Sequence, residues 1–421
     1  MANDLGPILS AAYPQVVATL IRVLGDMDRA MDATQDALVR ALQVWASDGV
    51  PDNPVAWLVT VGRNRAVDQL RREQRSISLD SNVVPLVAEL DSVDLTDSMD
   101  AAEWLAVDDD MLRLLFTCCH PELSPPAQMV LMLKVVLGFS TAEIARGLLA
   151  SPASIEKRIT RAKQQLKRAT VPYEVPPATE IPARVDAVLK AIYLIFNEGY
   201  TRFQDAGLSR GSLIDIAIRL GRMVSRLLRN DPEPRSLLAL MLLSAARLNA
   251  RVDEHGVFVP LEEQGRSRWH KGMIDEGVAL IDTVFAARHI PGAYQIQAAI
   301  SAIHSQAASA AETDWPQIAA LYNKLAQLDA SPVVPVNQAV ALCYCGKADQ
   351  ALTMLTAPEL SSKLISYQPY FAALSFAYEC AGQEPKSIDA LQRACELADS
   401  SAQRVYLQRR LQEKRGAQPA P

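Results

Sequence analysis

Several residue types are scarce in this 421-residue chain, and their scarcity excludes whole classes of protein. Aromatic residues make up only 6%, and no alternation of apolar and polar residues persists, so the sequence does not predict a β-sheet fold. The six Cys are scattered and fit reduced, mostly buried thiols rather than a disulfide framework. No apolar run reaches about 18 residues and no basic-plus-apolar leader is present, which predicts a cytoplasmic protein without a membrane partner.

Helix-forming residues dominate instead. Apolar residues account for 49% of the chain, and Ala, Leu, Arg, Gln and Glu recur at helical spacing, so we predict an all-α fold. The length allows about two to four domains. Because the formal net charge is -6, any contact with nucleic acid must come from local basic patches.

Residues 124–168 predict three short helices joined by tight turns. These boundaries rest on helix start and stop residues at the expected positions. They are Ser124-Pro125 and Gly138 for the first helix, Ser140 with Glu143 in capping-box spacing for the second, and Ser151-Pro152 for the third.

The third of these helices has two contrasting faces. Its inner face is predicted to be Ile155, Ile159, Ala162 and Leu166. From Ser151 to Arg168 there are six basic residues and one acid, a local charge of +5. A short helix, a turn and a basic helix predict a helix-turn-helix whose last helix enters the DNA major groove. The alternative is an ordinary three-helix pack with one solvated basic face.

Residues 8–75 form a second predicted helical domain, with helices at about 8–24, 28–45 and 54–74 and a loop at 47–54. From Arg63 to Arg75 the last helix carries five basic and two acidic residues, a charge of +3. Trp57 before this basic, amide-bearing stretch suits stacking on unpaired bases. Taken alone, a core Trp and a solvated charged end explain the pattern better.

Two connectors separate the predicted domains. Residues 76–110 hold ten acids and no Lys or Arg, which predicts an acidic, partly extended linker between domains 8–75 and 111–170. Residues 171–183 contain four Pro and predict a second linker. Cys118, Cys119 and His120 precede the helix-turn-helix, but adjacent Cys on a helix do not converge on one metal, so buried thiols are favoured over a zinc site.

The order of these parts resembles the extracytoplasmic-function sigma factors of bacterial RNA polymerase. The motifs that carry the resemblance are Ala33–Leu38 (ATQDAL), Trp57-Leu58, Arg63–Asp68 (RNRAVD), Arg71-Arg72, Gly138–Ala145 (GFSTAEIA) and Arg161–Lys163 (RAK). The join Phe116–Pro121 (FTCCHP) is similar to the subgroup that carries a long tetratricopeptide-like C-terminal extension. Met31 departs from the family, which usually has an acid in this helix.

The resemblance implies partners and site residues: core RNA polymerase, through its clamp and flap, and promoter DNA, with no cofactor, no metal and no enzyme activity. The polymerase would be bound by Asp32, Gln35 and Asp36. The upstream promoter element would be bound by Ser154, Lys157, Arg158, Arg161 and Lys163. The downstream element would be bound by Asp52, Asn53, Trp57, Arg63, Asn64, Arg71 and Arg72.

Residues 184–421 predict a helical C-terminal domain, with tetratricopeptide-like repeats from about residue 314. Ala341 and Ala377 lie 36 residues apart, close to the period of about 34 for that repeat. Stacked helix pairs of this kind form a concave surface that binds peptides or another domain. We therefore expect this half to regulate promoter activity, by intramolecular docking or by docking on polymerase. A generic helical bundle is the alternative.

Two other functions are alternatives to a sigma factor. The first is a helix-turn-helix regulator with a helical-repeat interaction domain, which would not need the second basic helix that bears Trp57 and Asn64. The second is an enzyme that uses Glu198, Tyr200 and His270. The sequence has neither a phosphate-binding glycine loop nor a nucleophile elbow, which disfavours the enzyme.

Overall fold

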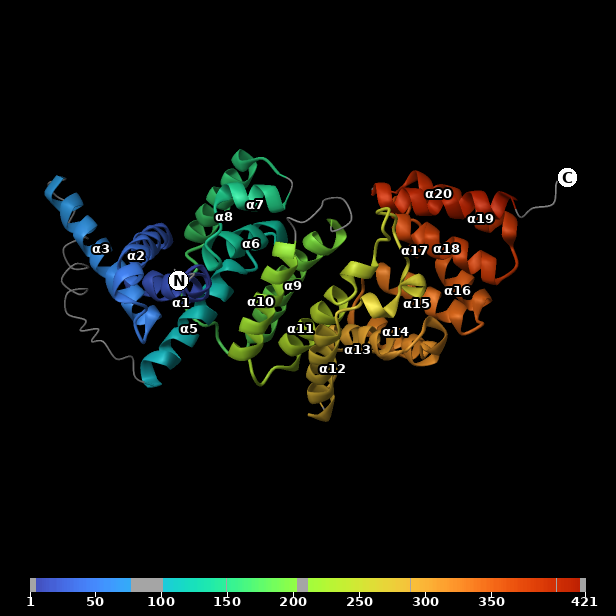
Figure 1. The fold of residues 1–421 in the computed structure, drawn as a ribbon, viewed down its shortest axis with the longest axis horizontal. Helices are drawn as coiled ribbons and strands as arrows, with labels where there is room; N and C mark the ends of the chain where they lie inside the picture. The colour runs from blue at the N-terminus through green and yellow to red at the C-terminus, as the bar shows by residue number, and fades with distance from the viewer. Residues whose placement is uncertain are drawn as a thin grey trace. The chain divides into compact units, whose positions relative to one another are not determined.

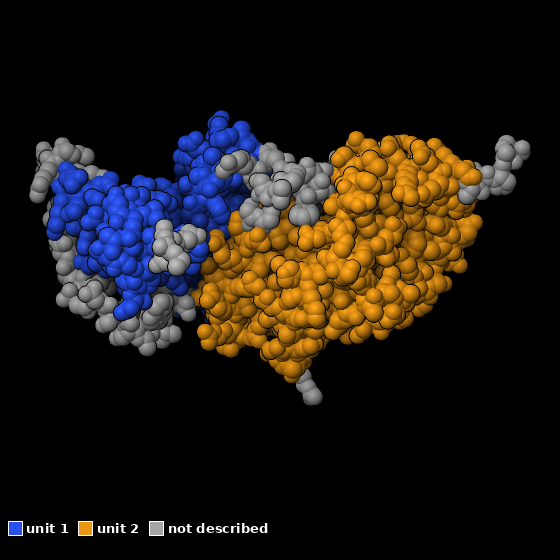
Figure 2. Space-filling model, in the orientation of Figure 1, with its two compact units in different colours: residues 1–194 blue, residues 195–421 orange. Residues whose placement is uncertain are grey.

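The computed structural model describes residues 5–76, 101–148, 150–202, 211–287, 289–398 and 400–416. The chain divides into two compact units, Met1–Leu194 and Ile195–Pro421 (Figures 1 and 2). The described residues are helical apart from turns and one isolated β-bridge between Val252 and Phe258. The predicted all-α class is therefore confirmed.

Unit 1 begins with three packed helices, α1 (Gly6–Leu24), α2 (Met27–Asp48) and α3 (Pro54–Ser76). The Asp26 carboxylate caps α2 by accepting hydrogen bonds from the backbone N–H groups of Asp28 and Arg29, both at 2.9 Å. At Gly62 a Cβ atom would lie 2.8 Å from the Leu20 side chain, so glycine allows α3 to approach α1 closely.

One helix in the described part of the chain, α1, is long and apolar enough to cross a membrane by length and composition. In the structure most of its apolar residues are buried within unit 1, among them Val16, Val17 and Leu20, each with no exposed surface. The helix therefore serves as a core helix of the bundle.

The rest of unit 1 contains α5 (Ala101–Cys118), α6 (Pro125–Leu131), a π-helical turn η1 (Met132–Val136), α7 (Thr141–Gly147) and α8 (Pro152–Arg168). The three helices predicted for residues 124–168 are present, with the π-turn ending the first. Because α5 starts at Ala101, the last ten residues of the predicted acidic connector are helical, and the Asp110 side chain is fully buried rather than solvated.

Helix α9 (Ile181–Arg202) runs from unit 1 into unit 2, so the predicted Pro-rich linker ends three residues early, at Glu180. The longer helices of unit 2 are α10 (Gly211–Leu227), α11 (Pro232–Ala245), α12 (Lys271–Ala286), α13 (Ala293–Gln306), α14 (Trp315–Leu328), α15 (Val333–Tyr344), α16 (Ala348–Leu355), α17 (Pro358–Ser361), α18 (Gln368–Cys380), α19 (Glu384–Glu396) and α20 (Ser401–Gly416). Short 3-10 turns are η2 (Leu248–Ala250), η3 (Leu261–Glu263), η4 (Arg266–Arg268) and η5 (Ala310–Glu312).

The repeat pattern of the C-terminal half corresponds to helix pairs in unit 2. Helices α15 and α16 pack together, as do α18 and α19 (Figure 1). Ala341 and Ala377 occupy corresponding buried positions on α15 and α18, 1% and 0% exposed, within one continuous apolar core. Small residues at these positions let the helices approach closely, as the repeat interpretation requires.

Candidate nucleic-acid interface

The predicted caps fix the starts of α7 and α8. The backbone N–H of Ser140 donates to Glu143 Oε2 at 2.8 Å, and the Glu143 N–H donates to Ser140 Oγ at 3.2 Å, which completes a capping box. Ser151 Oγ accepts the N–H of Ser154 at 3.2 Å and caps α8. Ser124 precedes α6 as predicted, but its side chain makes no capping hydrogen bond.

Helix α8 presents a charged surface to solvent. Its buried residues are Ile155, Ile159, Ala162 and Leu166, as the sequence predicted. Lys157, Arg158 and Arg161 are exposed, and within the described residues none of them has an ion-pair partner. We call these three residues the cationic face of α8. The half-buried Ser154 lies at the start of the same face.

Lys163 does not belong to this face. At about 100° per residue it lies about 200° around the helix from Arg161. Its side chain is 18% exposed and forms an ion pair with Asp28, beside the N-terminus of α2. Lys163 therefore differs in this conformation from the other residues predicted to bind the upstream element, and its contact with DNA stays a prediction.

The predicted polymerase-binding residues lie on one face of α2. Asp32, Gln35 and Asp36 are all exposed. Two apolar residues continue the same face and were missed by the sequence prediction, Val39 at 55% and Leu42 at 52% exposed. Their spacing from Asp32 and Asp36 could have identified them. The exposed stripe of α2, Asp32 to Leu42, combines charge with apolar surface, a composition typical of protein interfaces.

A cavity of ≈ 260 Å³ lies between α2 and α8. Its lining includes Asp32 and Gln35 from α2 and Thr160 and Lys163 from α8. Met31, the departure from the family pattern, also lines it. Helices α2 and α8, each predicted to bind a different partner, thus face one another in unit 1.

Other contacts hold this arrangement in place. Gly138 has a φ of 71°, and a Cβ there would lie 2.6 Å from the Tyr13 ring of α1. Burial raises the pKa of Tyr13 to about 12, and a hydrogen bond with Gln35 acts in the opposite direction. Tyr173 Oη donates to the backbone oxygens of Ala18 and Asp110 at 3.0 and 3.2 Å. The first residues of the predicted Pro-rich linker are therefore docked rather than free.

Asp110 is a fully buried charged residue of unit 1. Arg22 Nε donates to both of its carboxylate oxygens at 2.9 Å, and an Arg113 guanidinium N–H donates at 2.7 Å. Two arginines therefore compensate one fully buried carboxylate and join α1 to α5.

The downstream-element residues are divided between exposed and structural positions. Asn53 Oδ1 accepts the N–H of Ala56 at 3.1 Å and caps α3, and Trp57 packs edge-on against Trp45 with ring centroids 5.2 Å apart. Both side chains are half-buried, so their first role is structural. The exposed members are Asp52, Asn64, Arg71 and Arg72, while Arg63 is half-buried.

Cys118 and Cys119 are buried beside the helix-turn-helix, as expected. Burial raises the pKa of the Cys118 thiol to about 12, and it raises that of Cys119 as well. Cys119 Sγ lies 3.3 Å from Met132 Sδ, which places the thiol in a sulfur-rich apolar core.

Two of the residues named for an enzyme site, His270 and Tyr200, have structural roles in unit 2. His270 Nδ1 accepts the N–H of Met273 at 3.2 Å and caps α12. Tyr200 lies beneath the Arg251 guanidinium, whose Cζ is 4.0 Å from the ring centroid.

Comparison with protein families divides the chain in the same order. Residues 8–76 match Sigma-70 region 2, and residues 113–166 match Sigma-70, region 4. Residues 184–285 match a family of unknown function, DUF6596.

Individual relatives match either the whole chain or part of it. The chain is 39% identical over 414 residues to an uncharacterized protein of Rhizobium meliloti, covering 98% of this chain and 96% of that protein. It is 30% identical to the ECF RNA polymerase sigma factor SigL of Mycobacterium tuberculosis, over 38% of this chain and 87% of SigL. The ECF RNA polymerase sigma factor SigK of Mycobacterium ulcerans is 27% identical, over 36% of this chain and 78% of SigK. Among solved structures, yeast Tom70 aligns with a TM-score of 0.36 and 14% identity, over 97% of this chain and 83% of Tom70.

Proposed function

Because the chain belongs to the extracytoplasmic-function sigma factors of RNA polymerase, we propose that it binds core polymerase in the cytoplasm and directs it to promoters. The observation that carries this proposal is the cationic face of α8, three exposed charges without acidic partners on a firmly capped helix. Guanidinium groups so presented suit bidentate contacts with guanine in the major groove. A helix-turn-helix regulator would use the same face, but it would not need the exposed stripe of α2.

The exposed stripe of α2 is assigned to the polymerase clamp. Asp32 and Asp36 supply negative charge, and Val39 and Leu42 supply apolar surface that a partner would bury. The second domain, residues 111–170, is assigned to the polymerase flap and the minus-thirty-five element. Binding of purified core polymerase, measured by biolayer interferometry, tests the first assignment, and loss of binding on α2 substitution is the expected result.

Simultaneous use of both domains requires unit 1 to open. The minus-thirty-five and minus-ten elements lie about 25 base pairs apart, which corresponds to about 85 Å of duplex at about 3.4 Å per pair. In the structure α1 contacts both α5 and η1, and Lys163 pairs with Asp28. We therefore assign the closed unit to the free protein and an open unit to the polymerase complex. Spin labels at the exposed Gln43 and Gln164 should give a short distance in the free chain and a much longer one with core and promoter.

The downstream element is assigned to the loop before α3 and to the exposed face with Asn64. Asn64 offers both a donor and an acceptor to a base edge, and Arg71 and Arg72 lie farther along α3. Exchange of Val50–Asp52 for the loop of another family member should change minus-ten preference. Gly49 and Asn53 are kept because Gly49 has a φ of 86° and Asn53 caps α3. An unchanged preference would remove the loop from the site.

Residues 195–421 are assigned a regulatory role through docking, either on unit 1 or on polymerase. Support comes from stacked helix pairs of the kind that present concave peptide-binding surfaces. Two truncated chains test this role, one ending at Thr170 and one ending at Pro177, which retains Tyr173. Both should bind core polymerase, and both should transcribe differently from the full chain. A difference between the two truncated chains would measure how much the Tyr173 contacts stabilise the closed form of unit 1. Identical transcription by all three chains would refute a regulatory role for residues 195–421.

A further inference from the structure

The first half of unit 2 contains arginines that gather from two loops. Arg247 and Arg251 flank η2, and Arg266 is the first residue of η4. The two turns are in contact, and the His270 N–H donates to the Ala246 oxygen at 2.8 Å, which ties one loop to the other. We call Arg247, Arg251 and Arg266 the arginine cluster.

Two of these guanidinium groups are held in fixed positions by neutral partners. Arg251 lies over the Tyr200 ring and donates to the Tyr200 backbone oxygen at 3.1 Å. Arg266 lies 4.3 Å from the centroid of the Trp269 ring and donates from Nε to the Ala307 oxygen at 2.9 Å. Stacking and carbonyl contacts orient the groups but leave their positive charges uncompensated.

The cluster lacks an acidic partner. Among the described residues, no carboxylate lies within 4.0 Å of any of the three guanidinium groups. Glu262 acts on Arg266 electrostatically, but its carboxylate also hydrogen-bonds with Tyr344. All three arginines are half-buried, and charge partly removed from water without a counter-charge is unfavourable, so this arrangement favours an anion.

Unsatisfied N–H donors accompany the charge. Arg247 Nε is buried without an acceptor. The indole Nε1 of Trp269 is likewise buried without an acceptor, and the whole Trp269 residue is only 7% exposed. Burial lowers the pKa of His304 to about 4, and the charges of the nearby Arg247 and Arg266 act in the same direction. It is therefore neutral at pH 7 and adds no further repulsion toward the arginines.

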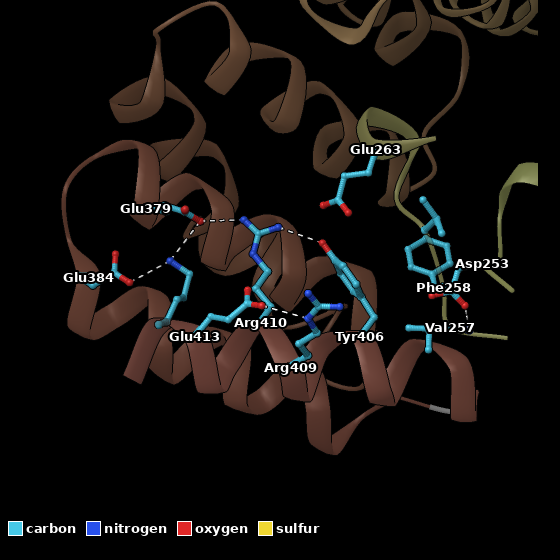
Figure 3. A pocket seen from close by; sticks show the side chains of 12 residues that line it. Asp253, Val257, Phe258, Glu263, Glu379, Glu384, Tyr406, Arg409, Arg410 and Glu413 are labelled. Carbon is cyan, nitrogen blue, oxygen red and sulfur yellow. Dashed lines mark hydrogen bonds and ion pairs between the residues drawn. The ribbon is translucent and has the colours of Figure 1, made fainter. Parts of the chain in front are cut away.

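The charged cavity beside α20 provides a contrast within the same unit (Figure 3). It has a volume of ≈ 730 Å³ and is lined by Arg409, Arg410 and Lys414. All three cations are already paired: Arg409 with Glu413 at 3.1 Å, Arg410 with Glu379 at 3.0 Å, and Lys414 with Glu384 at 2.9 Å. An anion entering there would have to displace carboxylates, whereas in the arginine cluster it would displace none.

We propose that the arginine cluster and the indole N–H of Trp269 form a binding site for a small oxyanion, carboxylate or phosphate. The planar guanidinium edges supply bidentate donors, and the oxyanion supplies the missing negative charge and the missing acceptors. This site lies in the region that matches the family of unknown function. It makes unit 2 a ligand-binding domain, and it stands independently of polymerase binding.

Calorimetric titration of the full chain with sodium phosphate and with sodium malonate, at an ionic strength matched with chloride, tests the site. Saturable binding of at least one of the two is expected, and which one binds identifies the oxyanion. Arg247→Gln should weaken binding about tenfold, because it removes a charge-assisted hydrogen bond. Arg409→Gln, which breaks a paired cation of the contrasting cavity, should leave it unchanged.

Thermal unfolding separates binding from folding. In chloride alone Arg247→Gln should unfold no earlier than the parent chain, because it removes an uncompensated charge, and only the anion-induced rise in Tm should be lost. Trp269→Phe, which keeps the ring and removes the N–H, should weaken binding as well. Binding of neither anion, or equal binding by Arg247→Gln and the parent chain, would overturn the proposal.

Discussion

Helices α8 and α20 are both strongly basic, yet they use their charge differently. From Ser151 to Arg168 there are six bases and one acid, and from Ser401 to Gly416 there are five bases and one acid, giving +5 and +4. On α8 the cationic face has no acidic partner among the described residues. On α20 Arg409, Arg410 and Lys414 are each bound to a glutamate, two of them to residues of α18 or α19.

The difference shows that local charge alone does not identify a nucleic-acid surface. Two of the paired cations of α20 join it to α18 and α19, while unpaired exposed cations remain available for phosphate and base edges. In this chain the pairing state separates a structural basic helix from one suited to DNA. The substitutions below test that distinction and its counterpart on α2, from the largest expected effect to the smallest.

Reversal of charge on the exposed stripe of α2 should have the largest effect. Asp36→Lys is expected to weaken binding of core polymerase by tenfold or more, since juxtaposed like charges at an interface cost on the order of several kcal/mol of binding free energy. Asp389→Lys makes the same change at an exposed position of α19 and should leave the affinity unaltered. Equal losses in the two variants would mean that overall charge, rather than this helix, governs the affinity.

The next effect concerns the cationic face of α8. Arg158→Ala and Arg161→Ala should each weaken specific promoter binding by about 1–3 kcal/mol and relax base preference, if the side chain contacts a base edge. Arg409→Ala removes a paired arginine from α20 and should not change promoter binding. Fluorescence anisotropy with promoter and scrambled duplexes measures the DNA affinity of the three variants. An effect of Arg409→Ala as large as the others would contradict the distinction between paired and unpaired cations.

Substitution of Lys163 should have a smaller effect, and it should raise rather than lower an affinity. Lys163→Ala removes the ion pair with Asp28, which is worth about 0.2–1 kcal/mol at an exposed site. Opening should become easier, so affinity for core polymerase should rise by up to about fivefold. Lys167→Ala, on the same flank of α8 and without an ion pair in the described residues, is the control. A fall in promoter affinity for Lys163→Ala alone would return Lys163 to the DNA-binding set.

The smallest effect is a change in salt dependence. If Lys157 contacts phosphate, Lys157→Ala should weaken binding to all sequences alike and reduce the slope of log affinity against log salt by about 1. Titration of promoter and scrambled duplexes at several salt concentrations measures the slope. A loss confined to the promoter would instead make Lys157 a base contact.

Much of the fold followed from local signals in the sequence. The Ser140–Glu143 capping box, the Ser151 cap and the apolar positions of α8 are short-range patterns, and the structure confirms each. The spacing between Ala341 and Ala377 likewise predicted equivalent buried positions. The caps and the apolar positions depend on residues within a few turns of each other, and the repeat on a fixed spacing, which is why a single sequence reveals them.

The features that escaped prediction depend on contacts between distant segments. Asp110 was counted as a linker charge, yet Arg22, 88 residues away, binds it in the core. Lys163 was counted with the DNA-binding residues, yet it pairs with Asp28 across 135 residues. The amino-acid composition of α20 is nearly as basic as that of α8, and only the structure shows that cations of α20 are paired with glutamates. Charge composition carries no information on such pairing.

Transcription from a promoter library with purified core polymerase tests the central claim most directly. The full chain should direct core polymerase to a defined set of promoters that core alone does not transcribe. The combined Arg158→Ala, Arg161→Ala chain should lose that selectivity, while Arg409→Ala retains it. Transcripts identical to those of core polymerase alone would contradict a sigma-factor function for this chain.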